Sequence, residues 1–336
     1  MKLYRILIVR ILLVIPVVLG IVTLTFFVSR VLAADPVELF MPPQADERLR
    51  QEVRESLGLD KPLFEQYRIF LAGLQHGSLG RSINTGRPVA ADLRDRLPAT
   101  VEMAGFALAL AIGIGIPLGV IAGATRDRWP DFLIRAVTLT GMALPAFWLG
   151  LILIFLFFVR LHWLPGPVGR FPIGVAPPPT ITGLFVVDSL IQGNLPAFRA
   201  SVAHLLLPSF TLGFVTMAPI ARVGRIAMIE ALQSEYIRTA HAMGISKGVV
   251  YFRYALKNTL LPVLTMIGSA VAFLFSGSVL VESIFNWPGM GQYALSAIRQ
   301  SDFSALQGFV IWAAFSYVIV FLVVDVLYLI VDPRTR

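Results

Sequence analysis

Residues 99–124 read ATVEMAGFALALAIGIGIPLGVIAGA, and Glu102 is the one charged side chain among them. About 20 apolar residues in a helix are enough to cross the roughly 30 Å hydrocarbon core of a bilayer. A stretch this long with one charge is typical of a membrane-spanning helix rather than of a buried helix in a soluble domain.

Five further apolar runs flank this one, at about residues 6–32, 132–159, 202–220, 260–281 and 306–331. The whole chain is 57% hydrophobic and 14% charged, with a mean hydropathy of +0.77, whereas soluble domains carry about 25% charged residues. The first run is longer than the apolar core of a signal peptide, so we expect it to stay in the protein. The sequence therefore predicts an all-α membrane protein with six transmembrane helices.

Basic residues predict the orientation. If the N-terminus is cytoplasmic, the inside segments are 1–5, 125–131, 221–259 and 332–336. The inside loop 221–259 then carries six of the basic residues: Arg222, Arg225, Arg238, Lys247, Arg253 and Lys257. The outside loops 160–201 and 282–305 carry three and one, which follows the positive-inside rule and places both termini in the cytoplasm. We attribute the net charge of +8 to contact with anionic lipid, not with nucleic acid.

One segment, residues 33–98, has the composition of a soluble region. Asp60-Lys61-Pro62 predicts the start of a helix there. We expect three parts: an N-terminal transmembrane helix at 1–32, an outer, periplasmic helical segment at 33–98, and a core of five transmembrane helices at 99–336. The outer segment is either a simple cap or a docking surface for a partner.

Catalytic and energy-converting motifs are missing from the sequence. It has no G-x-x-x-x-G-K-[ST] phosphate loop, no H-E-x-x-H, no G-x-S-x-G and no cysteine. The four histidines have no metal-ligand spacing, so we expect neither an enzyme nor a metal site in this chain. Asp325, inside the last run, is an ionisable group at membrane depth; it serves either ion coupling or a structural pairing within the bundle.

The loop at 221–259 predicts a helix, a break at Gly244 and a second helix that Ser246 can cap. Such an elbow between two spans can act as a lever that moves both of them. It can equally be a helical hairpin on the membrane surface, and the pattern alone does not separate the two.

The loop resembles the EAA loop of ABC importer permeases, in the form found in the dipeptide/oligopeptide permease family. The resemblance is carried by EYIRTAHAMG at 235–244 and by ALKN at 255–258. Other similar stretches follow in order along the chain: GSLGRS at 77–82, LPAT at 97–100, PAF at 145–147 and ESIFNWPGMG at 282–291.

The resemblance implies a type I ABC importer permease fold in a bacterial inner membrane. It implies four kinds of subunit around one pathway: this chain, a homologous second permease, two cytoplasmic ATPases and an extracytoplasmic binding protein. ATP and Mg would be bound by the ATPases, with no cofactor in this chain. The substrates would be di- or oligopeptides or similar small solutes, and the substrate-contacting residues stay unassigned. A gradient-driven secondary transporter is the alternative.

The resemblance also implies two groups of site residues. The ATPase-coupling group is Glu235, Arg238, Thr239, Ala240, His241, Ala242, Met243, Gly244, Ile245 and Ser246. The second group is either an outer gate or a plain turn at the membrane interface, and consists of Glu282, Trp287, Pro288 and Gly289.

Overall fold

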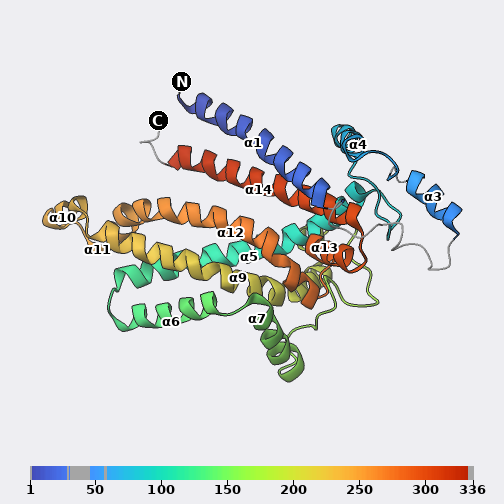
Figure 1. Cartoon of the computed structure of the whole chain (residues 1–336). Helices are drawn as coiled ribbons and strands as arrows, with labels where there is room; N and C mark the ends of the chain where they lie inside the picture. The colour runs from blue at the N-terminus through green and yellow to red at the C-terminus, as the bar shows by residue number, and fades with distance from the viewer. Residues whose placement is uncertain (1, 29, 31–45, 57–58, 332–336) are drawn as a thin grey trace. The chain divides into compact units, whose positions relative to one another are not determined.

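A computed structural model of the chain describes residues 2–28, 30, 46–56 and 59–331, and every regular element within these ranges is a helix (Figure 1). The elements before the third apolar run are α1 (Lys2–Phe27), α3 (Glu47–Ser56), α4 (Leu63–Gln75) and α5 (Val89–Ala124). The middle of the chain forms α6 (Trp129–Ala143), α7 (Ala146–Leu153), the π-helical η2 (Ile154–Arg160), α8 (Phe185–Ile191) and α9 (Leu195–Leu232). The last elements are α10 (Glu235–Ala242), α11 (Lys247–Val249), η3 (Val250–Ala255), α12 (Leu256–Ile284), α13 (Met290–Arg299) and α14 (Phe303–Val331).

Within the described residues, four helices are long and apolar enough to cross a membrane, and a bent pair of helices can supply a fifth span. α1 contributes a shorter apolar stretch, Leu12–Phe27. The all-helical membrane fold is therefore confirmed, and the count of six spans stays a prediction.

The sequence predicted one transmembrane helix for the third apolar run, but the structure divides this run into two helices. The chain bends by 106° between α6 and the helix from Ala146 to Arg160. The break lies at Leu144 and Pro145, where Leu144 is extended (φ −81°, ψ 128°). Proline disfavours the helical conformation in the residue before it, so α6 ends there and Pro145 starts α7.

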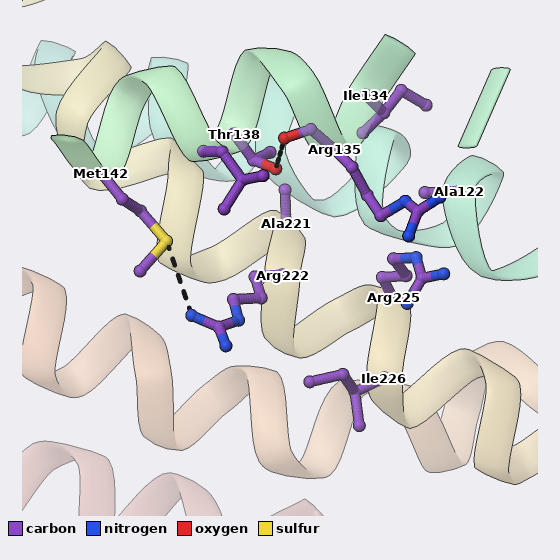
Figure 2. Close-up of a pocket in the computed structure, with 10 residues that line it drawn as sticks. Ala122, Ile134, Arg135, Thr138, Met142, Ala221, Arg222, Arg225 and Ile226 are labelled. Atoms are coloured by element: carbon purple, nitrogen blue, oxygen red, sulfur yellow. Dashed lines mark hydrogen bonds between the residues drawn. The ribbon is translucent and has the colours of Figure 1, made fainter. Parts of the chain in front are cut away.

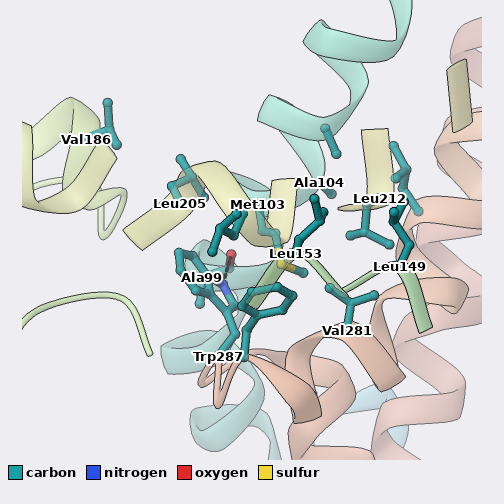
Figure 3. Close-up of a cluster of buried hydrophobic side chains, with 14 residues drawn as sticks. Ala99, Met103, Ala104, Leu149, Leu153, Val186, Leu205, Leu212, Val281 and Trp287 are labelled. Carbon is teal, nitrogen blue, oxygen red and sulfur yellow. Dashed lines mark hydrogen bonds between the residues drawn. The ribbon is translucent and has the colours of Figure 1, made fainter. Parts of the chain in front are cut away.

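The chain divides into two compact units. The larger one comprises Met1–Tyr4, Pro98–Gln292 and Tyr317–Arg336, and α9 is its central helix, in contact with α6, α7, α8 and α12. α5 lies against α9 at very short range: a Cβ on Gly119 would be 2.6 Å from the carbonyl oxygen of Ala221. Small residues allow helix backbones in membranes to approach this closely. Buried side chains of α5, α7, α9 and α12, among them Met103 and Leu212, form the core (Figure 3).

The smaller unit comprises Arg5–Leu97 and Tyr293–Ser316. α4 packs on α1 through aromatic rings: Phe26 is buried, and its ring centroid lies 5.5 Å from Phe70 and 5.2 Å from Tyr67. The Ser82 hydroxyl donates a hydrogen bond of 2.6 Å to Asp302 and so fastens the turn after α4 to the start of α14.

Two features of the predicted outer segment 33–98 can be compared with the structure. α4 begins at Leu63, directly after Asp60-Lys61-Pro62, as the sequence predicts. α5 begins at Val89, ten residues before the apolar run, so the segment ends in helix. Residues 31–45 and 57–58 lie outside the described ranges. The division of the chain at 32/33 and 98/99 stays a prediction.

Candidate coupling site

The loop predicted at 221–259 is mostly helical. α9 continues to Leu232, because the residues after position 220 are mostly good helix formers and one face of this stretch is buried. α10 starts at Glu235 after a two-residue break, and a further helix starts at Lys247 and continues through η3 into α12. We call residues 235–246 the elbow; Figure 1 shows α10 and α11 together at one end of the bundle.

Gly244 shapes the elbow. Its φ is +77°, a conformation that glycine adopts at no steric cost, and a Cβ there would meet nothing within 4 Å. The Gly244 N–H donates to the His241 carbonyl (3.0 Å), and the Ile245 N–H donates to the Ala240 carbonyl (3.1 Å). These two bonds form a Schellman motif, which ends α10 and turns the chain.

Two side chains fasten α10 to the bundle. Ile237 and Ala240 are 1% and 2% exposed. They belong to a buried cluster that includes Val120 of α5, Met228 of α9 and Val250 of η3. The Asn258 amide also donates a hydrogen bond of 2.6 Å to the Tyr236 hydroxyl, which ties α10 to α12. The elbow is thus packed against the ends of three long helices.

The other face of the elbow is exposed. Glu235 and Arg238 form an ion pair of 2.8 Å whose side chains are 84% and 72% exposed. The Thr239 hydroxyl donates to the Glu235 carbonyl (3.0 Å). Further along, His241, Ala242, Met243 and Ser246 are exposed, and Ile245 is half-buried. Ser246 occupies the N-cap position of α11, but its side chain makes no capping hydrogen bond.

The ten predicted coupling residues therefore lie on one continuous elbow. The prediction omitted Ile237 and Tyr236, which the structure places in the contacts between α10 and the bundle. The spacing of Ile237 and Ala240, three residues apart in a short helix, was a signal that could have identified the buried face.

Three of the four gate candidates are buried at the other end of the same unit. Glu282 is 0% exposed, and it accepts hydrogen bonds from the Thr100 hydroxyl (2.8 Å) and the Gln292 N–H (2.9 Å). Trp287 is 1% exposed and donates from Nε1 to the Ala99 carbonyl (2.8 Å). A Cβ on Gly289, which is also buried, would lie 2.5 Å from the Glu282 carboxylate.

A second carboxylate lies close to these groups. Glu102 accepts a hydrogen bond of 2.6 Å from the Arg170 guanidinium and one of 2.8 Å from the Val186 N–H. The Arg170 guanidinium stacks over the Phe185 ring, 3.7 Å from its centroid, and lies 5.9 Å from the Trp287 ring. We call Thr100, Glu102, Arg170, Glu282, Trp287 and Gly289 the buried polar cluster. Pro288 alone among the gate candidates is exposed.

This packing favours the interpretation of residues 282–289 as a structural turn in the described conformation, since their functional groups are already bonded within the protein. Asp325, the other ionisable candidate, lies in α14, and its side chain is outside the described residues. The same holds for residues 332–336, which the sequence places in the cytoplasm.

Two family models match the chain. Residues 115–336 match the binding-protein-dependent transport system inner membrane component. Residues 3–104 match the N-terminal region of the membrane component of such systems. Together the two matches extend over both units, except for residues 1–2 and 105–114, and include the elbow and the buried polar cluster.

Relatives of similar length match almost end to end. The Probable D,D-dipeptide transport system permease protein DdpB of Escherichia coli (strain K12) is 45% identical over 95% of this chain and 93% of its own length. The dipeptide transport system permease protein DppB of Alkalihalophilus pseudofirmus is 37% identical over 97% and 98%. The glutathione transport system permease protein GsiC of Escherichia coli O6:H1 is 34% identical over 97% of both chains.

Proposed function

Because the chain belongs to the binding-protein-dependent transport system inner membrane component family, we propose that it is a permease subunit of an ATP-driven importer. It forms the transport pathway together with a homologous second permease. Two ATPase subunits bind on the cytoplasmic side, and a binding protein delivers the substrate from outside. The N- and C-termini and the elbow lie in the cytoplasm, in keeping with the excess of Arg and Lys in the segments assigned there.

The substrate class that we propose is small peptides. Three relatives carry the words D,D-dipeptide, dipeptide and glutathione in their names, and all three ligands are short chains of amino-acid units. The presence of three different names among relatives at 34–45% identity supports the class of ligand and no single member of it.

The observation that carries the proposal is the two-faced elbow. One face of α10 is fixed to the bundle by Ile237 and Ala240. Arg238 and His241 of α10, and Met243 directly after it, are exposed on the surface of the subunit. A helix held in this way transmits a push on its exposed face to α5, α9 and α12 together. This is the element that ATPase closure needs in order to change the state of the pathway.

The first test is purification of the full chain from its native membrane in mild detergent, followed by identification of the proteins that accompany it. We expect a second permease of similar size and one or two P-loop ATPases. Recovery of the chain alone, under conditions that keep known importers assembled, would contradict the proposal.

A second test introduces a charge on the exposed face of the elbow. Met243→Glu changes a side chain that is 67% exposed, so folding is retained, but it places a desolvated carboxylate in the proposed contact. We expect loss of the ATPase subunits from the purified complex and loss of uptake. Ile173→Glu, at an 81% exposed position in the loop before α8, is the matched control and should keep the ATPases bound. If both variants retain the ATPases equally, Met243 does not lie in the contact with the ATPase.

A further inference from the structure

A second feature of the larger unit is a cavity of about 270 Å³ between α5, α6 and α9. Its polar lining includes three arginines, Arg135 of α6 and Arg222 and Arg225 of α9; its apolar lining includes Leu139, Met142 and Ile226. Figure 2 shows the ends of the Arg135 and Arg225 side chains close together, with Arg222 beside Met142. None of these residues belongs to the elbow or to the buried polar cluster.

The positive charge of this arginine pocket is only partly neutralised. Asp131 is fully buried and binds Arg225 through both carboxylate oxygens, at 2.6 and 2.8 Å. Arg135 reaches the same carboxylate only at 3.6 Å, and its buried Nε has no hydrogen-bond partner. Among the described residues Arg222 has no carboxylate partner; its contact is the Met142 sulfur at 4.0 Å. The charge of Asp127 also acts on Arg225, but Asp127 is exposed and pairs with Arg126 at 3.2 Å. The three lining guanidinium groups and the buried Asp131 carboxylate therefore carry a net charge of +2.

The walls of the arginine pocket suit a ligand that is part anion and part hydrocarbon. Leu139, Met142 and Ile226 are all exposed large apolar side chains in the same cavity as the arginines. α6 starts with the exposed Trp129, and tryptophan is enriched where helices leave the membrane for water. At 1.5 Å per residue, Arg135 lies about 9 Å and Met142 about 20 Å along α6 from Trp129. The pocket therefore extends from the headgroup layer into the acyl layer.

We propose that the arginine pocket binds the phosphate headgroup of an anionic phospholipid, with an acyl chain against its apolar wall. One guanidinium group can donate two parallel hydrogen bonds to two phosphate oxygens. Basic pockets between membrane helices are suited to anionic headgroups. The bound lipid bridges α6 and α9 within ten residues of the end of α9, and the elbow begins three residues after that end. A soluble anion would use the arginines but leave the apolar wall uncovered.

The test uses the purified full chain, with its accompanying subunits, after removal of native lipid. Binding of dioctanoyl phosphatidylglycerol and of dioctanoyl phosphatidylcholine is measured by native mass spectrometry. We expect a preference for phosphatidylglycerol, and an affinity at least about tenfold lower in Arg222→Gln, since a charge-assisted hydrogen bond is lost. Arg199→Gln, the same change at an exposed position near the other end of α9, should bind as the unaltered chain does.

Arg222 is the residue to change because its loss leaves no buried carboxylate unpaired, so the thermal midpoint should not move. If Arg222→Gln nevertheless aggregates, Ile226→Trp enlarges a side chain that lines the pocket without altering a charge, and it should weaken phosphatidylglycerol binding in the same way. Equal binding of the two lipids, or equal affinity in Arg222→Gln and Arg199→Gln, would overturn the proposal. Displacement of the lipid by millimolar inorganic phosphate or by a dipeptide would also overturn it, since the site would then take soluble anions.

Discussion

The elbow and the buried polar cluster each contain an ion pair, but the two pairs differ in exposure. At the elbow, the side chains of Glu235 and Arg238 are 84% and 72% exposed. In the buried polar cluster, the side chains of Glu102 and Arg170 are 3% and 8% exposed. The N–O distances are similar, 2.8 and 2.6 Å. An exposed pair contributes little to stability because water solvates each partner well when they separate. A buried pair leaves an uncompensated charge when one partner is lost. One end of the unit therefore keeps its charges available to a partner, and the other uses them internally.

The largest effect expected from this difference is that of Arg170→Met. The change leaves Glu102 buried without its cation, which should destabilise the protein by about 3–5 kcal/mol. The thermal midpoint of the purified chain in detergent is the measurement. Arg238→Met is the matched control at the elbow and should cost at most about 0.5 kcal/mol. If the thermal midpoint falls equally in both variants, the proposed difference between the buried and the exposed ion pair is wrong.

A smaller effect is expected where Gly289 meets Glu282. An added Cβ would lie 2.5 Å from three atoms of a carboxylate that Thr100 and Gln292 hold in place. We expect Gly289→Ala to cost about 1–3 kcal/mol, which is typical of overpacking. Gly248→Ala, in the helix after the elbow, meets nothing within 4 Å and should stabilise that helix by up to about 1 kcal/mol. A neutral Gly289→Ala would mean that residues 282–289 line open space, as a gate would.

The sequence predicted the elbow better than the buried polar cluster, and the reason is the range of the contacts. The backbone hydrogen bonds that form α10 and the turn at Gly244 join residues at most five apart, so local pattern is enough to predict them. Glu102, Arg170 and Glu282 are brought together from positions up to 180 residues apart, and no local pattern distinguishes a gate from a packed turn. The bend at Pro145 was missed because hydropathy is continuous across it.

Asp188 gives a pH-dependent way to test the end that holds the buried polar cluster. Burial raises the pKa of this carboxyl, but hydrogen bonds from the Thr182 hydroxyl and from the N–H groups of residues 181–183 outweigh burial and hold the pKa below its usual value. A lowered pKa contributes stability above the unfolded-state pKa of about 3.9, and that stability is lost as the pH falls through the folded-state pKa.

Asp188→Asn should therefore cost about 1–2 kcal/mol at pH 7, and the difference from the unaltered chain should shrink as the pH falls below about 4. Thermal midpoints of both proteins between pH 3 and pH 7, in roughly unit steps, measure this. A constant difference over that range would mean that the side-chain shape of Asp188, and not its charge, holds the loop.

The smallest effect on global stability is expected at Gly244, where the elbow is held to the bundle by few side chains. Gly244→Ala forces φ +77° on a residue with a Cβ and should cost about 1 kcal/mol, while Gly244→Asn tolerates this conformation better. Because the strain is released by opening the turn locally, the loss should appear as faster hydrogen exchange at the Ile245 amide, which bonds Ala240. If ATPase closure acts through this turn, uptake per ATP should fall in the order glycine, asparagine, alanine. Equal uptake in all three, with exchange at Ile245 accelerated only in the alanine variant, would mean that the turn shapes the elbow without transmitting force.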